Sequence, residues 1–276
     1  MRDSNRPKPT VVAGIDGSQA AINAAEWAVE EAISREVPLR LVYVIAEQVE
    51  LAPLASVGSV RMEVEYGETA LRIASSAVKA TRKSVQVETA ILRGDPAAML
   101  IGESRNAMMV CIGSVGIGRC ARAFLGSTAT ELADRAHCPV AIIRTRHHQL
   151  KPDSPMIVVA VNESPDNDDV VEQAMQEAQL RHAPVLALGE LRKSFGDRPS
   201  DELDRRVQCW SRRHPGVKIC AATIPDDIAD FSAVLDRTIQ LAVIGSSEAD
   251  QVARLIGPHS HPIVGHAECS VLVVRS

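Results

Sequence analysis

The sequence is poor in aromatic residues and has no long apolar run. Phe, Trp and Tyr make up 3% of its 276 residues. No window approaches the ~18 consecutive apolar residues that span a bilayer. The opening segment, MRDSNRPKP, lacks the apolar core of a secretion signal. We therefore expect a cytoplasmic protein that makes no use of membranes.

Paired cysteines and an excess of positive charge are also missing. None of the six cysteines forms a C-x-x-C pair. Cys111, Cys138 and Cys269 border apolar runs, which is typical of reduced core cysteines. Because 30 Lys and Arg stand against 35 Asp and Glu, the net charge is −5. A broad basic face for nucleic acid is not expected.

Short apolar segments alternate with helical patterns along the chain. The segments lack strict alternation, which favours parallel strands covered on both faces. Helical spacing follows Ser18, a candidate N-cap, and includes Ala28 and Ile33. The expected strands are 10–15, 39–45, 85–92, 107–112 and 140–143, and the expected helices include 63–82, one starting at Pro96, and 130–136. The helix at 63–82 is expected to bury Val64, Leu71, Ile73 and Val78. This order predicts an α/β fold with a parallel sheet and helices on both faces.

The pattern then repeats. After a polar segment at 144–155, the run at 156–161 leads into Asn162-Glu-Ser, which matches Asp16-Gly-Ser at a shift of 146 positions. The sequence VIGS at 243–246 matches CIGS at 111–114. The repeat predicts two domains of one fold, residues 1–148 and 149–276, each with a five-stranded, mainly parallel sheet.

A glycine-rich loop joins one predicted strand to a helix. It begins GSVGIGR at Gly113 and closes with Gly126-Ser127-Thr128. Glycines let backbone N–H groups approach an anion, and the start of a helix supplies unpaired donors and a favourable dipole. Phosphate is therefore the first ligand expected there.

The spacing of this loop resembles a known family. Gly113, Gly116, Gly126 and Ser127 follow the pattern G-2x-G-9x-G-[ST] of ATP-binding universal stress proteins. The first half resembles that family from residue 11 to 144, and the second half at 156–164 and 241–275. The resemblance implies a tandem universal stress protein with two Rossmann-like domains of the adenine nucleotide alpha hydrolase type.

The resemblance also implies roles for residues. Asp16 would contact the sugar and base region, and Gly14 would let the ligand approach the strand end. The residues implied in phosphate binding are Gly113, Ser114, Val115, Gly116, Ile117, Gly118, Arg119, Gly126, Ser127 and Thr128. Other roles stay open: Asp16 as a helix-start carboxylate, Gly14 as a close-packing glycine, and Ser127 or Thr128 as an ordinary N-cap.

Three further features are weaker signals. Arg122 would neutralise phosphate charge or be solvated. Gly94 and Pro96 match the family's turn below the adenine. A cluster of His259, His261, His266 and Glu268 lies in a glycine-proline loop without cysteine partners, so no metal site is expected.

The second half departs from the nucleotide motif. Asn162 replaces Asp16, Ala160 replaces Gly14, and Glu248 and Asp250 replace Gly116 and Gly118. Gly257 and Pro258 replace the closing Gly-Ser. A carboxylate about 4 Å from a phosphate charge costs about 1 to 4 kcal/mol in a solvated site. We expect one ATP per chain, in the first half.

The function implied by the resemblance is a nucleotide-dependent regulatory module in stress adaptation. It would hold ATP, with or without Mg²⁺, and act on an unknown protein partner. No carboxylate or His in the first-half loop is placed to orient water, so hydrolysis would be slow at most and no catalytic residue is assigned.

Two alternatives stay open. One is an adenylating or hydrolysing enzyme of the adenine nucleotide alpha hydrolase group, whose Ser-Gly-Gly-x-Asp-Ser motif is absent from residues 13–18. The other is a nucleotide-free interaction scaffold. In either case, the apolar terminal strands at 140–143 and 271–274 invite antiparallel pairing, between halves or between chains, and we expect a homodimer.

Overall fold

The computed structural model describes residues 8–46, 57–116, 125–144, 155–190, 199–224, 239–256 and 269–275. The chain divides into two compact units, Met1–Thr145 and Arg146–Ser276. The predicted boundary between residues 148 and 149 lies outside the described ranges. Each unit is treated by itself.

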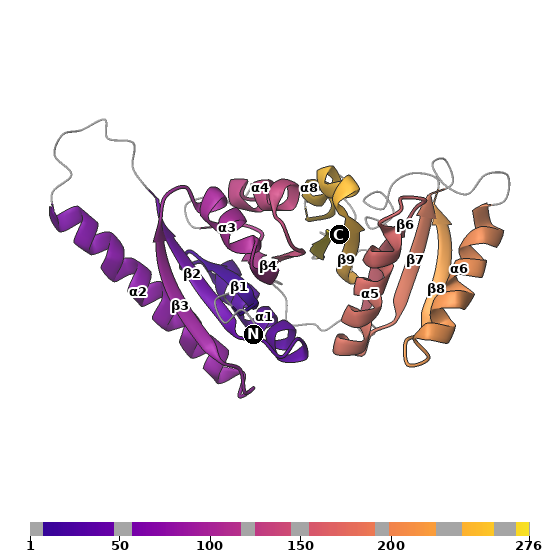
Figure 1. The fold of residues 1–276 in the computed structure, drawn as a ribbon, viewed down its shortest axis with the longest axis horizontal. Coiled ribbons are helices and arrows are strands. Elements are labelled where there is room, and N and C mark those ends of the chain that lie inside the picture. The colour runs from indigo at the N-terminus through magenta and orange to yellow at the C-terminus, as the bar shows by residue number, and fades with distance from the viewer. Residues whose placement is uncertain are drawn as a thin grey trace, which may run out of the picture. The chain divides into compact units, whose positions relative to one another are not determined.

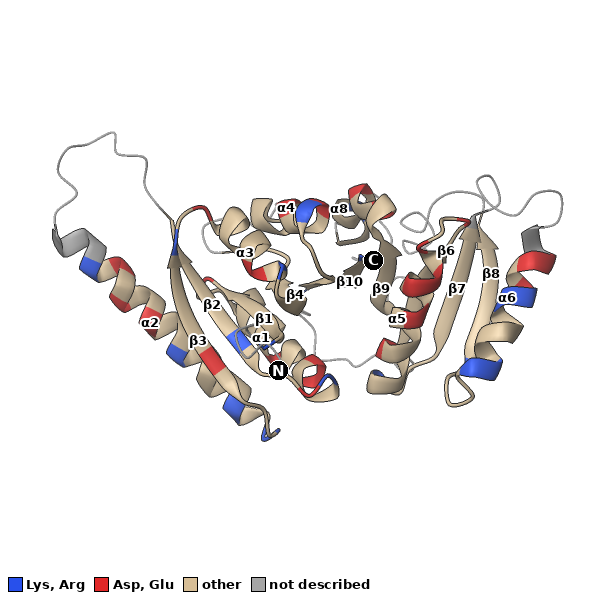
Figure 2. Ribbon diagram, viewed as in Figure 1, with Lys and Arg blue, Asp and Glu red and all other residues tan. Residues whose placement is uncertain are grey.

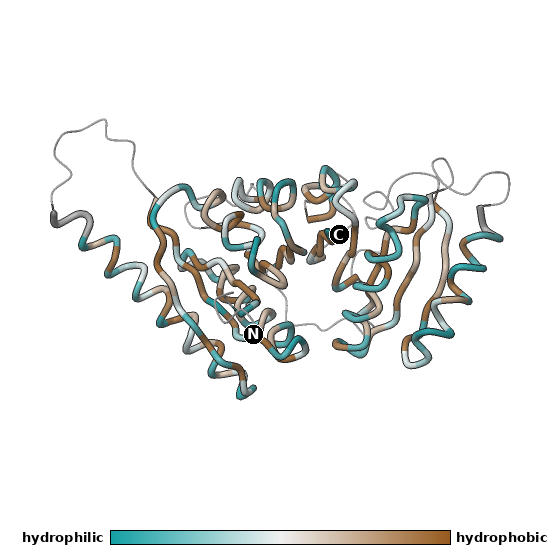
Figure 3. The backbone as a smooth tube through the Cα atoms, in the orientation of Figure 1, coloured by the Kyte–Doolittle hydropathy of each residue, from teal (hydrophilic) through white to brown (hydrophobic). Residues whose placement is uncertain are grey.

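The first unit is a five-stranded parallel sheet. Its strands run in the order β3-β2-β1-β4-β5. They are β1 (Thr10–Ile15), β2 (Leu39–Ile45), β3 (Val87–Arg93), β4 (Ala107–Gly113) and β5 (Val140–Ile143). The central strands are apolar throughout, as Figure 3 shows, because helices cover both faces of the sheet.

In the described part of the first unit, four helices connect these strands, and Figure 2 shows acidic and basic residues along them. The helices are α1 (Gln19–Ser34), α2 (Val57–Ala80), α3 (Pro96–Ser104) and α4 (Ser127–Arg135). Helix α1 packs beside α2, and α3 packs beside α4 (Figure 1). The chain passes outward from β1 to β2 and β3, and then returns to β4 and β5 on the other side of β1. Because such crossovers are right-handed, α1 and α2 lie on one face of the sheet and α3 and α4 on the other. The connections of β1 and β4 therefore run in opposite directions.

The second unit repeats this arrangement. Its parallel strands run in the order β10-β9-β6-β7-β8. They are β6 (Met156–Val161), β7 (Val185–Glu190), β8 (Ile219–Ile224), β9 (Ile239–Gly245) and β10 (Ser270–Val274), with α5 (Asn167–Arg181), α6 (Pro199–Arg213), the 3-10 helix η1 (Ser246–Gln251) and α8 (Val252–Ile256). Matched through the repeat, the two strand orders are identical. The predicted α/β fold is confirmed.

The repeat extends to buried charges that the sequence analysis missed. Glu31 and Glu177 occupy equivalent positions in α1 and α5, and both are almost fully buried. Each pairs with an arginine one helical turn later, Arg35 or Arg181. A buried carboxylate is costly unless it is paired, which explains why the glutamate and the arginine occur together in both units.

Several expectations need correction. Helix α2 begins at Val57 rather than at residue 63, and β3 covers 87–93 rather than 85–92. Ile73, predicted to be buried, is 50% exposed. The buried face of α2 follows Gly67, Ala74 and Val78, and Ile73 lies about 100° around the helix from its neighbour Ala74.

Other expectations are confirmed. Leu71 and Val78 of α2 are buried, whereas Val64, also expected to be buried, is half-buried. Cys111, Cys138 and Cys269 are buried free cysteines. Within the described ranges, no helix has both the length and the hydropathy needed to cross a membrane.

Two helix glycines provide a test of the packing under α2. A methyl group on Gly67 would lie 2.7 Å from the Tyr43 ring, whereas one on Gly102 in α3 would have no neighbour within 4 Å. We predict that Gly67→Ala lowers the free energy of unfolding by about 1 to 3 kcal/mol through overpacking. Gly102→Ala should raise it by about 0.5 to 1 kcal/mol. Chemical denaturation measures both, and equal effects would contradict this packing.

Candidate functional site

A cavity of about 250 Å³ lies at the carboxyl ends of β1 and β4. These strands are neighbours whose connections wind in opposite directions, and ligands of open α/β sheets bind at such a point. Residues from β1, β2, β4, α1, α3 and α4 line it. They are Gly14, Ile15, Asp16, Ser18, Ala21, Val42, Val44, Pro96, Leu100, Ile112, Gly113, Val115, Gly116, Gly126, Ser127, Thr128 and Ala129.

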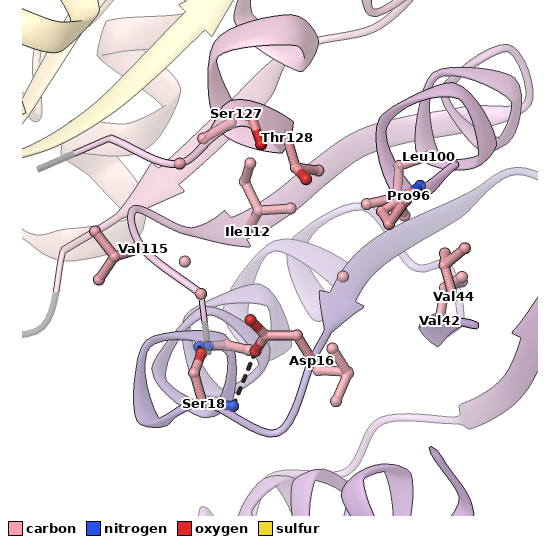
Figure 4. Close-up of a pocket in the computed structure, with 17 residues that line it drawn as sticks. Asp16, Ser18, Val42, Val44, Pro96, Leu100, Ile112, Val115, Ser127 and Thr128 are labelled. Carbon is pink, nitrogen blue, oxygen red and sulfur yellow. Dashed lines mark hydrogen bonds between the residues drawn. The ribbon is translucent and has the colours of Figure 1, made fainter. Parts of the chain in front are cut away.

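Asp16 is held at the cavity by the turn that starts α1. Its Oδ1 accepts a hydrogen bond from the Ser18 N–H at 2.9 Å (Figure 4). Ser18 in turn caps α1, because its Oγ accepts from the Ala21 N–H at 3.1 Å. Gly17 has a φ of +90°, which lets the chain make this turn. The predicted N-cap is confirmed. Asp16 also acts as a carboxylate at the helix start, because its Oδ1 accepts the Ser18 N–H.

The glycines around Asp16 leave no room for side chains. A methyl group on Gly14 would lie 3.0 Å from Cγ2 of Ile112. One on Gly113 would lie 2.7 Å from the backbone carbon of Ala20 at the start of α1. One on Gly116 would overlap Oδ2 of Asp16. Close packing therefore explains Gly14 and Gly113, and Gly116 keeps the space beside the Asp16 carboxylate open.

The start of α4 forms the opposite wall. The helix begins at Ser127 with Gly126 as N-cap, so neither Ser127 nor Thr128 is the N-cap, and the helix begins before the predicted residue 130. The first N–H groups of a helix have no intrahelical partner. Ser127, Thr128 and Ala129 form this first turn and line the cavity. Figure 4 shows both hydroxyl side chains across the cavity from Asp16.

Two of the predicted phosphate donors are used inside the unit. The Ser114 N–H donates to the Ile143 carbonyl at 2.9 Å, and the Gly126 N–H donates to the Ser114 carbonyl at 2.8 Å. Ser114 is also buried. These bonds fasten the loop end to β5 and α4, so both residues position the wall instead of presenting N–H groups to a ligand.

An apolar wall completes the cavity, and sequence reasoning found little of it. Val42 and Val44 are two residues apart on β2, so both project from one side of the sheet. Leu100 lies on α3, which starts at Pro96 under an Asp95 cap. Ile112 comes from β4. The strand order places β2 and β4 on either side of β1. This order is the signal that would have identified the valines of β2 and the isoleucine of β4.

Some predicted residues fall outside the described ranges. Ile117, Gly118 and Arg119 lie between residues 116 and 125, as does Arg122. The cluster of His259, His261 and His266 lies between 256 and 269. Among the residues that the structure does describe, no group of three or more His, Cys, Asp and Glu is placed to hold a metal ion.

The negative charge of Asp16 affects the pKa of Tyr43 on β2. Burial raises the pKa of Tyr43 above its ordinary value, and the nearby Tyr66, Asp16 and Glu63 raise this pKa further. The two tyrosine rings meet edge to face, 6.1 Å apart. Negative charge near Tyr43 disfavours its ionised form, which explains the direction.

In the described part of the second unit, a pocket of about 40 Å³ lies beside Asn162, Gly245 and Glu248. Asn162 Oδ1 accepts from the Ser164 N–H at 2.9 Å, as Asp16 does from Ser18. Asp250 does not border this pocket. The two units thus share the turn but differ in the residues beside it.

Comparison with known proteins identifies the family. A sequence profile of the universal stress protein family matches residues 9–144. A universal stress protein of Mycobacterium tuberculosis is 50% identical over 275 residues, which is 99% of either chain. The chain belongs to the universal stress protein family. Another family member from that organism is 36% identical over 277 residues, covering 99% of this chain and 98% of its own.

A solved structure shows the same fold in a universal stress protein from another organism. The crystal structure of a universal stress protein from Archaeoglobus fulgidus superimposes with a TM-score of 0.71 over 96% of both chains. The identity is 16%, so the likeness concerns the fold alone. The predicted tandem Rossmann-like architecture of a universal stress protein is therefore confirmed over the full length compared.

Tyrosinate titration tests the electrostatics of the site. Tyr43 and Tyr66 are the two tyrosines of the sequence, so Tyr66→Phe leaves Tyr43 as the single reporter. We predict that Tyr43 then ionises above about pH 10, the ordinary value for tyrosine. Adding Asp16→Asn should lower this midpoint, because it removes a negative charge that disfavours tyrosinate. Ultraviolet absorbance follows the titration. An unchanged or raised midpoint would contradict the proximity of Asp16.

Proposed function

We propose that this universal stress protein is an ATP-binding regulatory module and that it holds one ATP in its first unit. One observation carries the proposal: the cavity of about 250 Å³ joins an apolar wall to the first turn of a helix. An adenine needs the first surface and a phosphate chain needs the second. The glycine spacing seen in the sequence supports the same assignment.

Each wall has a proposed partner in the nucleotide. The adenine would pack against Val42, Val44 and Leu100, which offer apolar side chains on one side of the cavity. The ribose hydroxyls would donate to the carboxylate of Asp16. The phosphates would lie toward the N–H groups and hydroxyls of Ser127 and Thr128, with residues 117–119 as further proposed donors.

The described lining of the cavity has few titratable groups, which favours a regulatory role over catalysis. Asp16 is the one acid, base or thiol among the described residues that line the cavity. It lies across the cavity from Ser127 and Thr128, at the end proposed for the ribose. No group that would orient a water for attack on the γ-phosphate stands near that helix start among these residues. Occupancy by ATP would then be the signal that a protein partner senses, with or without Mg²⁺.

Assembly is a separate proposal. A homodimer through the terminal strands β5 and β10 stays a prediction from their apolar sequences. Sedimentation of the full chain with and without ATP would show whether assembly and nucleotide occupancy are linked.

Calorimetry with ATP tests the proposed site. We predict one ATP per wild-type chain and a 10- to 100-fold weaker affinity for Asp16→Asn. The amide keeps the bond from the Ser18 N–H, as Asn162 does in the second unit, but offers one acceptor fewer to the ribose. Losing a hydrogen bond to a charged group costs about 1.5 to 3 kcal/mol, which corresponds to this change.

The second unit supplies the matched control. Asn162→Asp makes the reciprocal change and should leave ATP affinity and stoichiometry unaltered. Product analysis separates the alternatives: trace ADP suits a regulatory module, whereas AMP with pyrophosphate requires an adenylating enzyme. Absence of any bound ATP at millimolar concentration would favour the nucleotide-free scaffold and overturn the proposal.

A further inference from the structure

Two of the differences between the units lie at facing positions beside a shared turn. Asp16 and Asn162 are equivalent, and Oδ1 of each accepts a backbone hydrogen bond of 2.9 Å from the residue two positions on. The outer side of each side chain faces the segment after the next strand of the sheet, β4 or β9. That segment carries Gly116 in the first unit and Glu248 in the second, at the same distance from the end of its strand.

Glu248 binds the groups that this corner of the fold presents. Its Oε1 accepts a hydrogen bond from the side-chain amide of Asn162. Its Oε2 accepts from the Gly245 N–H at 2.8 Å. Gly245 is the equivalent of Gly113, a glycine that ends β4 at the cavity of the first unit. A carboxylate of the chain itself therefore occupies the corner that Gly116 leaves open in the first unit.

The two substitutions depend on each other. A carboxylate at position 248 facing an aspartate at 162 would set two negative charges side by side, whereas asparagine turns an N–H donor toward it. In the first unit the reverse holds, because even a methyl group on Gly116 would overlap Oδ2 of Asp16. Each unit therefore carries a matched pair: Asp16 with Gly116, which is open, and Asn162 with Glu248, which is closed.

We propose that Glu248 is a built-in anionic ligand of the second unit and that the residue at this position decides which unit accepts a nucleotide. The inference rests on the proposed function for the site of the first unit. It gives a different reason for the exclusion of phosphate: the carboxylate already accepts the hydrogen bonds of the Asn162 amide and the Gly245 N–H, in addition to repelling an anion.

A purely local role for Glu248 accounts for only half of its contacts. Glu248 accepts a hydrogen bond from the N–H of Gly245, the N-cap of η1, three residues away. Capping does not require Asn162, which lies 86 residues away in sequence. Arg206 from α6 adds a bond of 2.8 Å to the Asn162 carbonyl, so this residue is fixed from both sides.

Nuclear magnetic resonance of the full chain tests the contact without any nucleotide. We predict that Glu248→Gly shifts the side-chain amide protons of Asn162 and speeds exchange of the Gly245 amide at least tenfold. Glu248→Ala is the second variant, in case glycine perturbs η1. A change at Gly245 with the Asn162 amide unaltered would reduce Glu248 to a helix cap and overturn the inference.

Placing the Asn–Glu pair of the second unit at positions 16 and 116 of the first unit tests whether the pair prevents ATP binding. We predict that Asp16→Asn with Gly116→Glu raises the dissociation constant for ATP at least tenfold more than Asp16→Asn with Gly116→Ala. Equal binding by the two double variants would overturn the inference while wild-type binding upholds the proposed function. A wild-type chain that binds no ATP would overturn the proposed function, and the nucleotide claim with it.

Discussion

The first unit depends on the close approach of backbones where β1 and β4 end side by side. Gly113 brings β4 against the start of α1 at a distance that no side chain permits. Gly14 packs closely against two side chains, because a methyl group there would lie 3.0 Å from Ile112 and 3.1 Å from Leu100. Because the strand connections leave this point in opposite directions, the helices part above it and a cavity remains. The Asp16 turn and the first turn of α4 face each other across that cavity.

The second unit keeps the framework of the first unit and carries different residues at the equivalent corner. The strand order, the asparagine turn and the buried Glu177–Arg181 pair all repeat features of the first unit. What differs is the contents of the corner, where Glu248 and Asn162 bond to each other. The two units thus share a core, while the residues at this corner differ in size and charge.

Much of this architecture could be predicted from the sequence. Unbroken apolar runs located the strands, and the repeat gave the second unit its fold. Helix starts were harder: α4 begins at Ser127 because Gly126 serves as its N-cap, and a glycine cap gives no side-chain signal. Ile73 was misassigned because an apolar residue on the flank of a helix resembles one on its buried face. Val42 and Leu100 join the cavity through strand order and crossover geometry, which no local pattern contains.

The central claim is that backbone N–H groups at the start of α4 hold the phosphates of a nucleotide. Hydrogen exchange of the full chain with and without ATP tests it most directly. The account predicts that ATP slows exchange of the Ser127, Thr128 and Ala129 amides and leaves the start of α5 and the Gly245 amide unchanged. Protection in the second unit, or none at the start of α4 under saturating ATP, would contradict it.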